Sequence, residues 1–313
     1  MKVLAIGGGG MLGSHTVGRL SVEKKKYDVI IGVSTGAMML CLLGIGDDES
    51  YEKLKQAYTT TTNEDLFTVY PFTKNSELSV FKTIWRSVTG HTSIGATDNL
   101  DKFIRKWFTR TDYNKLQKSN TEVIVAVLNV TTGCVEYKSS KDSYSYEEFT
   151  RYVAAASSPE LITSLWEFDG WEYSDAGLAT LVPIVEATNV PNVTEIDCYI
   201  HRPFTRVIKN SKPLLRKKFL QIIKACYRYV LIQRDNLEYN ELREGILTCL
   251  VENIPIKVYF MDNQFKVNSM VMNPEKMLEL YEYGKNNHYN KNMMIEFTKE
   301  NYKQYFKKQS GIS

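Results

Sequence analysis

Short apolar runs alternate with longer mixed stretches in the first part of the chain. Val3–Ile6 and Tyr27–Ile31 are apolar runs that predict strands, and Met11–Val22 and Ala37–Leu43 predict helices. A helix that joins two strands forms a parallel βαβ unit, and strands without a polar face are buried on both sides. The pattern therefore predicts an α/β fold around a parallel sheet.

The later part of the chain continues this mixture of elements. Residues 122–139 predict two strands around a Thr-Thr-Gly turn, and a helix follows that ends before Pro159. Residues 211–241 predict a long helix, residues 256–262 a strand and residues 297–309 a basic helix. Four basic side chains lie off the apolar stripe of the long helix: Lys217, Lys218, Lys224 and Arg228. They predict a solvated face or, as the alternative, contact with anionic lipid headgroups.

Length and composition predict one domain of an ordinary globular protein. The 313 residues show no repeats and no low-complexity linker, so we expect a single domain over residues 1–313. The sequence motifs of this domain lie within residues 1–184, and residues 185–313 complete the domain. Within the first part, residues 49–120 are rich in aromatic side chains and predict a cap over a substrate channel. The net charge of +3 does not indicate a nucleic-acid partner. The uncharged run over residues 29–46 holds four glycines and predicts buried core.

Cysteine usage and the N-terminus predict the compartment. The five cysteines are widely spaced and form no C-x-x-C pair, so we expect neither a disulfide framework nor a zinc site. The apolar run after Lys2 is too short for a signal peptide. We therefore expect a cytoplasmic protein without a metal or cofactor.

A nucleophile motif follows the second predicted strand. Residues 32–36 read Gly-Val-Ser-Thr-Gly, which fits G-x-S-x-G. In this motif a serine occupies a strained turn between a strand and a helix, and Gly32 and Gly36 leave the space that the turn needs. Because an apolar strand precedes and an apolar helix follows, Ser34 is the candidate nucleophile.

The glycines after the first strand allow two interpretations. Gly8, Gly10 and Gly13 satisfy the dinucleotide-binding pattern G-x-G-x-x-G. That fold needs an acidic residue at the end of the second strand, but Asp28 lies near the start of that strand. The loop is therefore better suited to present backbone amides to the oxyanion of an acyl-transfer intermediate.

From the residues alone, the serine has two candidate catalytic bases: His201 as part of a triad, or Asp175 directly. The order Ser34, Asp175, His201 matches the triad order of α/β-hydrolases, although in that fold several strands precede the nucleophile and here only one does. The alternative is a Ser–Asp dyad in which Asp175, in the sequence SDAG, acts directly.

Taken together, GGGGMLG, GVSTGA and SDAG resemble the motifs of the patatin-like phospholipases in order and spacing, from Met1 to about Ile184. The resemblance implies a three-layer α/β/α fold with a mostly parallel central sheet. It also implies Ser34 as nucleophile, Asp175 as base, and no metal. The amides implied for the oxyanion hole are those of Gly8, Gly9, Gly10 and Met11.

The resemblance implies a serine acyl hydrolase that acts on phospholipids or lysophospholipids and contacts the membrane surface peripherally. An acyltransferase or thioesterase on the same dyad is the alternative within enzymes. Two departures from the family pattern keep a catalytically weak lipid-binding protein as a third interpretation: Leu12 stands where the family has Arg or Lys, and Ala176 follows the aspartate in place of glycine.

Overall fold

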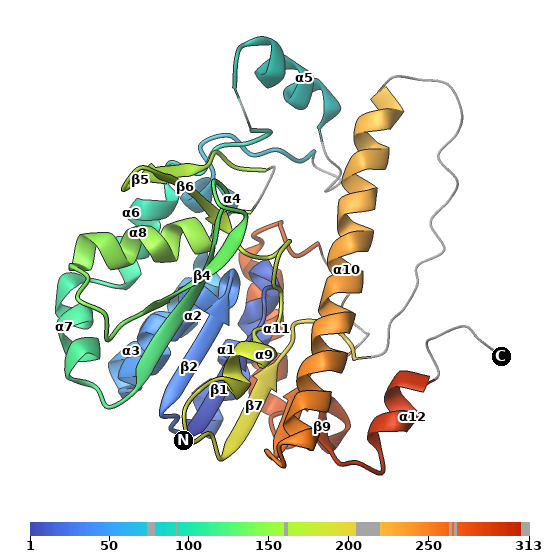
Figure 1. Cartoon of the computed structure of the whole chain (residues 1–313). Coiled ribbons are helices and arrows are strands. Elements are labelled where there is room, and N and C mark those ends of the chain that lie inside the picture. The colour runs from blue at the N-terminus through green and yellow to red at the C-terminus, as the bar shows by residue number, and fades with distance from the viewer. Residues whose placement is uncertain are drawn as a thin grey trace.

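A mixed sheet of nine strands lies at the centre of the structure (Figure 1). This computed structural model describes residues 1–73, 79–91, 93–159, 162–204, 220–262, 265 and 268–307. Five neighbouring strands run parallel in the order β3-β2-β1-β7-β8. β4 and β6 pair antiparallel with β3, β9 pairs antiparallel with β8, and β5 pairs antiparallel with β6. The strands are β1 (Lys2–Ile6), β2 (Val29–Val33), β3 (Glu122–Asn129), β4 (Cys134–Ser139), β5 (Trp166–Phe168), β6 (Trp171–Asp175), β7 (Glu195–Tyr199), β8 (Ile256–Tyr259) and β9 (Met294–Phe297).

Helices cover both faces of this sheet because successive strand residues point to opposite sides. Leu4 and Ile30 belong to one buried cluster, and their neighbours Ala5 and Ile31 belong to another. The first face is covered by α1 (Gly13–Glu23), α2 (Thr35–Ile45), α3 (Asp48–Thr60), α6 (Leu100–Trp107), α7 (Arg110–Lys118) and α8 (Tyr146–Ala156), with α11 (Pro274–Asn286) packed on α1 and α3. The second face is covered by α9 (Ile184–Thr188), α10 (Leu220–Val251) and α12 (Tyr302–Lys307).

This arrangement confirms the predicted three-layer α/β/α class with its mostly parallel sheet. The uncharged run over residues 29–46 forms β2 and α2 and is buried in the core. Among the described helices, none combines the length and apolar composition that a membrane crossing requires.

The long helix predicted over residues 211–241 is α10, which continues to Val251. Residues 211–219, with Lys217 and Lys218, lie outside the described part of the chain. The basic helix predicted over residues 297–309 is shorter in the structure: α12 covers Tyr302–Lys307, Phe297 ends β9, which pairs with β8, and residues 308 and 309 lie outside the described part of the chain.

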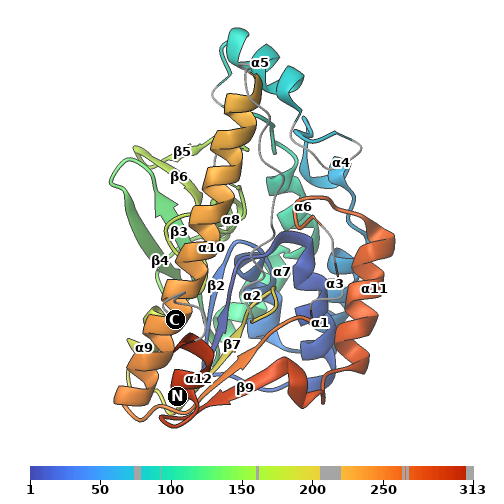
Figure 2. The same ribbon diagram turned by 90° about the vertical axis from the view of Figure 1, so that its right-hand side faces the viewer.

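The segment predicted as a cap divides into two parts. α3 and α7 pack in the helical layer, where Leu54 and Leu116 are buried. Between them the chain forms α4 (Asn63–Leu66) and α5 (Val80–Val88), and α5 projects beyond the sheet, beside the first turns of α10 (Figures 1 and 2). The remaining short elements are η1 (Gly10–Leu12) and η2 (Lys291–Met293).

Candidate active site

Ser34 occupies the turn between β2 and α2 in a strained backbone conformation. Its φ of 55° and ψ of −120° lie in a region that residues with a side chain rarely adopt. A Cβ added at Gly32 would lie 2.5 Å from the carbonyl of Gly36, and one at Gly36 would lie 2.5 Å from the carbonyl oxygen of Ile6. The two glycines therefore permit the close crossing of strand and helix that the motif predicts.

The pairing of β3 brings Asp175 to this turn. β2 pairs with residues 122–126 of β3, and β6 pairs with residues 127–129. β4 pairs along residues 124–129 and overlaps both, so it occupies the opposite edge of β3. β2 and β6 therefore lie end to end along one edge of β3, and the end of β2 at Ser34 meets the end of β6 at Asp175.

The Asp175 carboxyl is buried and its proton affinity is high. Burial raises its pKa to about 7, whereas hydrogen bonds from the Ser34 hydroxyl and the Gly177 amide, and the positive charge of Arg234, oppose that rise. The Gly177 amide donates to the carboxylate at 2.9 Å, and the Asp175 amide donates to the carbonyl of Ser158 at the end of α8. A carboxyl with a pKa near neutrality can exchange protons with a serine hydroxyl at physiological pH.

The glycine loop lies against Ser34, and only part of it has free amides. A Cβ added at Gly8 would lie 3.1 Å from the Ser34 Cβ. The Gly8 amide donates to the Leu181 carbonyl and the Met11 amide to the Ser269 carbonyl, each at 2.9 Å. Within the described residues, the amides of Gly9 and Gly10 donate to no acceptor. Of the four amides predicted for the oxyanion, Gly9 and Gly10 are therefore the two that have no acceptor among the described residues.

His201 lies behind this loop and is not joined to the dyad. Its ring packs against Gly9, and its Nδ1 is 3.2 Å from the Thr16 hydroxyl. Burial lowers its pKa to about 4, so the imidazole is neutral. In the described part of the chain neither Ser34 nor Asp175 hydrogen-bonds to it, although the triad order is present in the sequence.

Leu12 and Ala176, the two departures from the family pattern, are accommodated by apolar packing. Leu12 is buried with Met261 and Leu280 in a small cluster beside α11. Ala176 is fully buried against Val33 and Ala126, so its methyl group fits under the end of β2. Neither side chain displaces Ser34 or Asp175.

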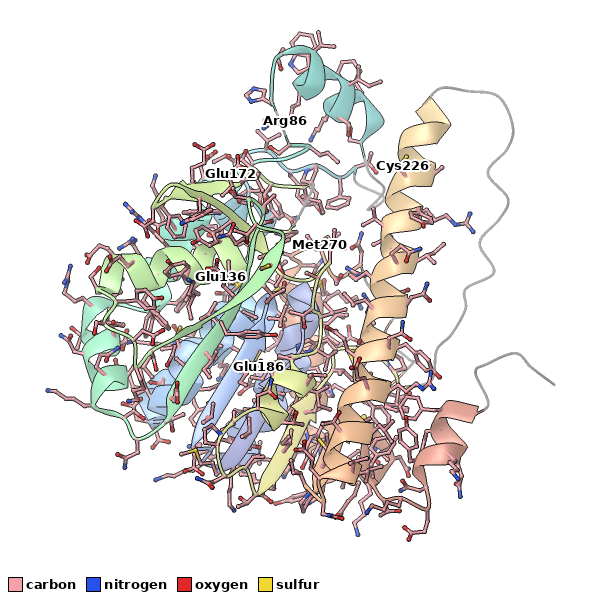
Figure 3. The ribbon with its side chains drawn as sticks, viewed as in Figure 1. Arg86, Glu136, Glu172, Glu186, Cys226 and Met270 are labelled. Atoms are coloured by element: carbon pink, nitrogen blue, oxygen red, sulfur yellow. The ribbon has the colours of Figure 1, made fainter. Side chains whose placement is uncertain are left out.

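An apolar cavity begins at Ser34, and together with the open space at its mouth it has a volume of about 650 Å³. Gly10, Met11 and Thr35 line the same end, and the cavity continues between α2, α3 and α6. Among the described residues that line it, none is charged and five are methionines: Met11, Met38, Met270, Met272 and Met277. Figure 3 labels Met270 at the upper end of the sheet. Flexible thioether side chains adapt to ligands of varied shape.

Two residues of α10 that act on the site were not identified from the sequence. Arg234 contributes positive charge at Asp175. Glu241 Oε2 accepts from the amides of Leu181 at 2.8 Å and Val182 at 2.9 Å. The Leu181 carbonyl in turn holds the Gly8 amide, so Glu241 connects the segment after Asp175 to the glycine loop. The basic face of this helix predicted a solvated surface or contact with anionic lipid headgroups, and no local pattern marks these two positions.

We expect Glu241→Ala to lower the free energy of unfolding by about 3 kcal/mol, because two amides lose a charged acceptor. Glu241→Gln keeps an oxygen acceptor and is expected to lose less than half of that. Glu244→Ala changes an exposed carboxylate on the same helix and is the matched control. Urea denaturation of the three variants measures the effect, and equal losses for Glu241→Ala and Glu244→Ala would contradict this role.

Comparison with known proteins agrees with the sequence motifs. The sequence model of the family described as patatin-like phospholipase matches residues 4–188, more than half of the chain. Among solved structures, the chain is similar to VipD from Legionella pneumophila, with a TM-score of 0.43 and 11% sequence identity, over 95% of this chain and 68% of that one. No curated protein matches the sequence.

Proposed function

The chain belongs to the patatin-like phospholipase family, and from this membership we propose that it is a serine acyl hydrolase. It would cleave fatty-acyl esters of phospholipids or lysophospholipids through a Ser34–Asp175 dyad. The observation that supports the proposal is that three features occur together at one place. They are a serine at positive φ, a buried carboxyl with a pKa raised to about 7, and an uncharged cavity that begins at the serine.

Acylation follows from the positions of these groups. Ser34 Oγ attacks the ester carbonyl carbon while Asp175 accepts the hydroxyl proton. The amides of Gly9 and Gly10 stabilise the oxyanion of the tetrahedral intermediate, because they have no acceptor among the described residues. When the intermediate collapses, Asp175 gives its proton to the leaving alkoxide, and the acyl group remains on Ser34 as an ester.

Deacylation repeats these steps with water. Asp175 takes a proton from the water molecule that attacks the acyl-enzyme, the same amides stabilise the second oxyanion, and Ser34 leaves with the proton. The products are a free fatty acid and the restored dyad. A base that alternates between the two protonation states works best when its pKa is near the working pH.

The chemistry of the cavity supports a lipid substrate. Its uncharged lining and its methionines suit a flexible hydrocarbon chain, and each methylene group that it buries contributes about 0.8 kcal/mol. The side chains on α5 support a second part of the proposal, peripheral contact with a membrane. Phe81, Trp85 and Val88 are 77%, 63% and 79% exposed on one short helix, beside the segment that lines the cavity at Leu66 and Thr97.

A fluorophosphonate probe followed by peptide mass spectrometry tests the proposal directly. We expect a covalent adduct on Ser34, together with release of free fatty acid from a mixed panel of phospholipids and lysophospholipids. An intact protein that gives neither the adduct nor the fatty acid would rule out the hydrolase and leave lipid binding without turnover.

The same assay separates hydrolysis from acyl transfer. Glycerol or a thiol is added as a competing acceptor, and the products are divided between free acid and the new ester or thioester. We expect free acid to dominate, because the proposed base needs only water to complete the cycle. Preferential transfer to the added acceptor would assign the dyad to an acyltransferase.

A further inference from the structure

A second apolar cavity lies deeper in the helical layer, next to the cavity at Ser34. Together with the open space connected to it, this cavity has a volume of about 370 Å³. Among the described residues that line it, none is charged. Cys41 belongs to this lining, and burial raises the pKa of its thiol, so the thiol stays neutral. An apolar cavity of this kind does not hold water well.

The two cavities share one wall. Four side chains line both of them: Met38, Ala57, Tyr58 and Phe103. The Tyr58 hydroxyl bonds to both the hydroxyl and the carbonyl of Thr35 at 2.8 Å, which fixes that ring. Phe103 packs edge-on against Trp107 at 6.4 Å between ring centroids. Met38 is half-buried and unbranched, so it is the part of the wall that can change rotamer.

Met38 also lies one helical turn from the nucleophile. Its amide donates to the Ser34 carbonyl at 3.2 Å in the first turn of α2. An acyl chain that starts at Ser34 and fills the outer cavity therefore reaches Met38 before any other movable part of the wall. Once Met38 rotates, the chain can continue between α2, α6 and α8, where Cys41, Ile104 and Val153 line the inner cavity.

We propose that the inner cavity binds the distal end of a long acyl chain and that Met38 is the movable residue that admits it. This inference rests on the proposed function, because it requires an acyl group on Ser34. It assigns the protein to long-chain rather than short-chain esters, and it places chain-length selection in the inner cavity, whose lining includes neither Ser34 nor Asp175.

Two alkyl fluorophosphonates, one with an ethyl chain and one with a hexadecyl chain, test the inference through their rates of labelling. In wild type we expect the long probe to react faster. Cys41→Leu adds apolar volume to the inner cavity alone. We expect it to slow labelling by the long probe about tenfold, because one methylene group in an apolar pocket changes the rate by about that factor. The short probe should keep its rate.

Three further variants complete the test. Cys41→Ala changes the same position without filling the cavity and should leave the ratio of the two rates unchanged. Val153→Leu fills the cavity from α8 and should repeat the selective loss, which keeps the test valid if Cys41→Leu does not fold. Met38→Ala removes the movable side chain and should raise the ratio of long to short probe.

The outcomes separate this inference from the proposed function. Labelling of Ser34 at equal rates by both probes, or an equal slowing of both in Cys41→Leu and Val153→Leu, would overturn the inner cavity as a chain site and leave the hydrolase intact. Failure of both probes to label Ser34 in folded wild type would overturn the proposed function itself.

Discussion

Ser34→Ala is expected to lower kcat/KM for a short-chain ester by a factor of about 10⁶, the loss seen when a serine nucleophile that acts as part of a unit is removed. The expectation follows from the position of the hydroxyl. Ser34 lies at the mouth of the cavity and donates to the buried Asp175 carboxylate. Without Oγ no acyl-enzyme can form, and the amides of the glycine loop have no covalent intermediate to stabilise.

Ser157→Ala is the matched control for this variant. Ser157 lines the same cavity. Its hydroxyl lies 2.8 Å from the Val153 carbonyl and 3.4 Å from the Ser34 carbonyl, a backbone atom that the proposed mechanism does not use. We expect nearly wild-type kcat/KM for this variant. Initial rates with a chromogenic ester give both values, and circular dichroism confirms that each variant is folded. Turnover that survives in Ser34→Ala would assign the chemistry to another group.

The strained turn at Ser34, the proposed nucleophile, could be predicted from the sequence because its geometry is set by neighbouring residues. An apolar strand, a serine between two glycines and an apolar helix are all local, and the structure places Ser34 at positive φ between β2 and α2. Asp175 is different. An aspartate before Ala-Gly is typical of an ordinary turn. The residues alone left two arrangements open for Asp175, and the family resemblance chose between them, since the meeting of β2 and β6 along one edge of β3 depends on distant pairings.

The distribution of free amides could not be predicted for the same reason. Gly8 and Met11 donate to Leu181 and Ser269, which come much later in the chain. Glu241 faces the site because α10 packs closely on α9, where a Cβ added at Gly245 would collide with Ile184. Such contacts depend on tertiary packing and leave no periodic signal in the sequence.

Asp175→Asn is expected to lower kcat/KM by about 10⁴, the effect of an isosteric change that removes the acidic partner in a serine hydrolase. In wild type, kcat/KM should rise with pH and level off above about 7, because only the ionised carboxylate can accept the serine proton. The variant should lose this rise. A flat wild-type profile between pH 5 and pH 8, which are assay conditions on either side of that pKa, would show that Asp175 is not the base.

The same substitution is expected to stabilise the protein at alkaline pH. Burial raises the folded-state pKa of Asp175 from 3.8 to about 7, so the ionised form lowers the free energy of unfolding. This loss of stability is absent at a pH below the unfolded-state pKa, grows as the pH rises between the two pKa values, and is complete above the folded-state pKa. At 1.36 kcal/mol per pKa unit, the full decrease in the free energy of unfolding is about 4 kcal/mol.

The side-chain amide that Asp175→Asn introduces would carry no charge at any pH, and its oxygen could still accept from Gly177. We therefore expect Asp175→Asn to unfold at a higher temperature than wild type in alkaline buffer, with a difference that shrinks as the buffer is acidified toward the unfolded pKa of 3.8. Asp169→Asn changes an exposed carboxylate in the turn that precedes β6, at a positive φ that asparagine tolerates, and should show no such trend. A lower melting temperature for Asp175→Asn in alkaline buffer would mean that the buried carboxylate stabilises the fold, and the dyad would then lose the proton affinity on which its role as a base depends.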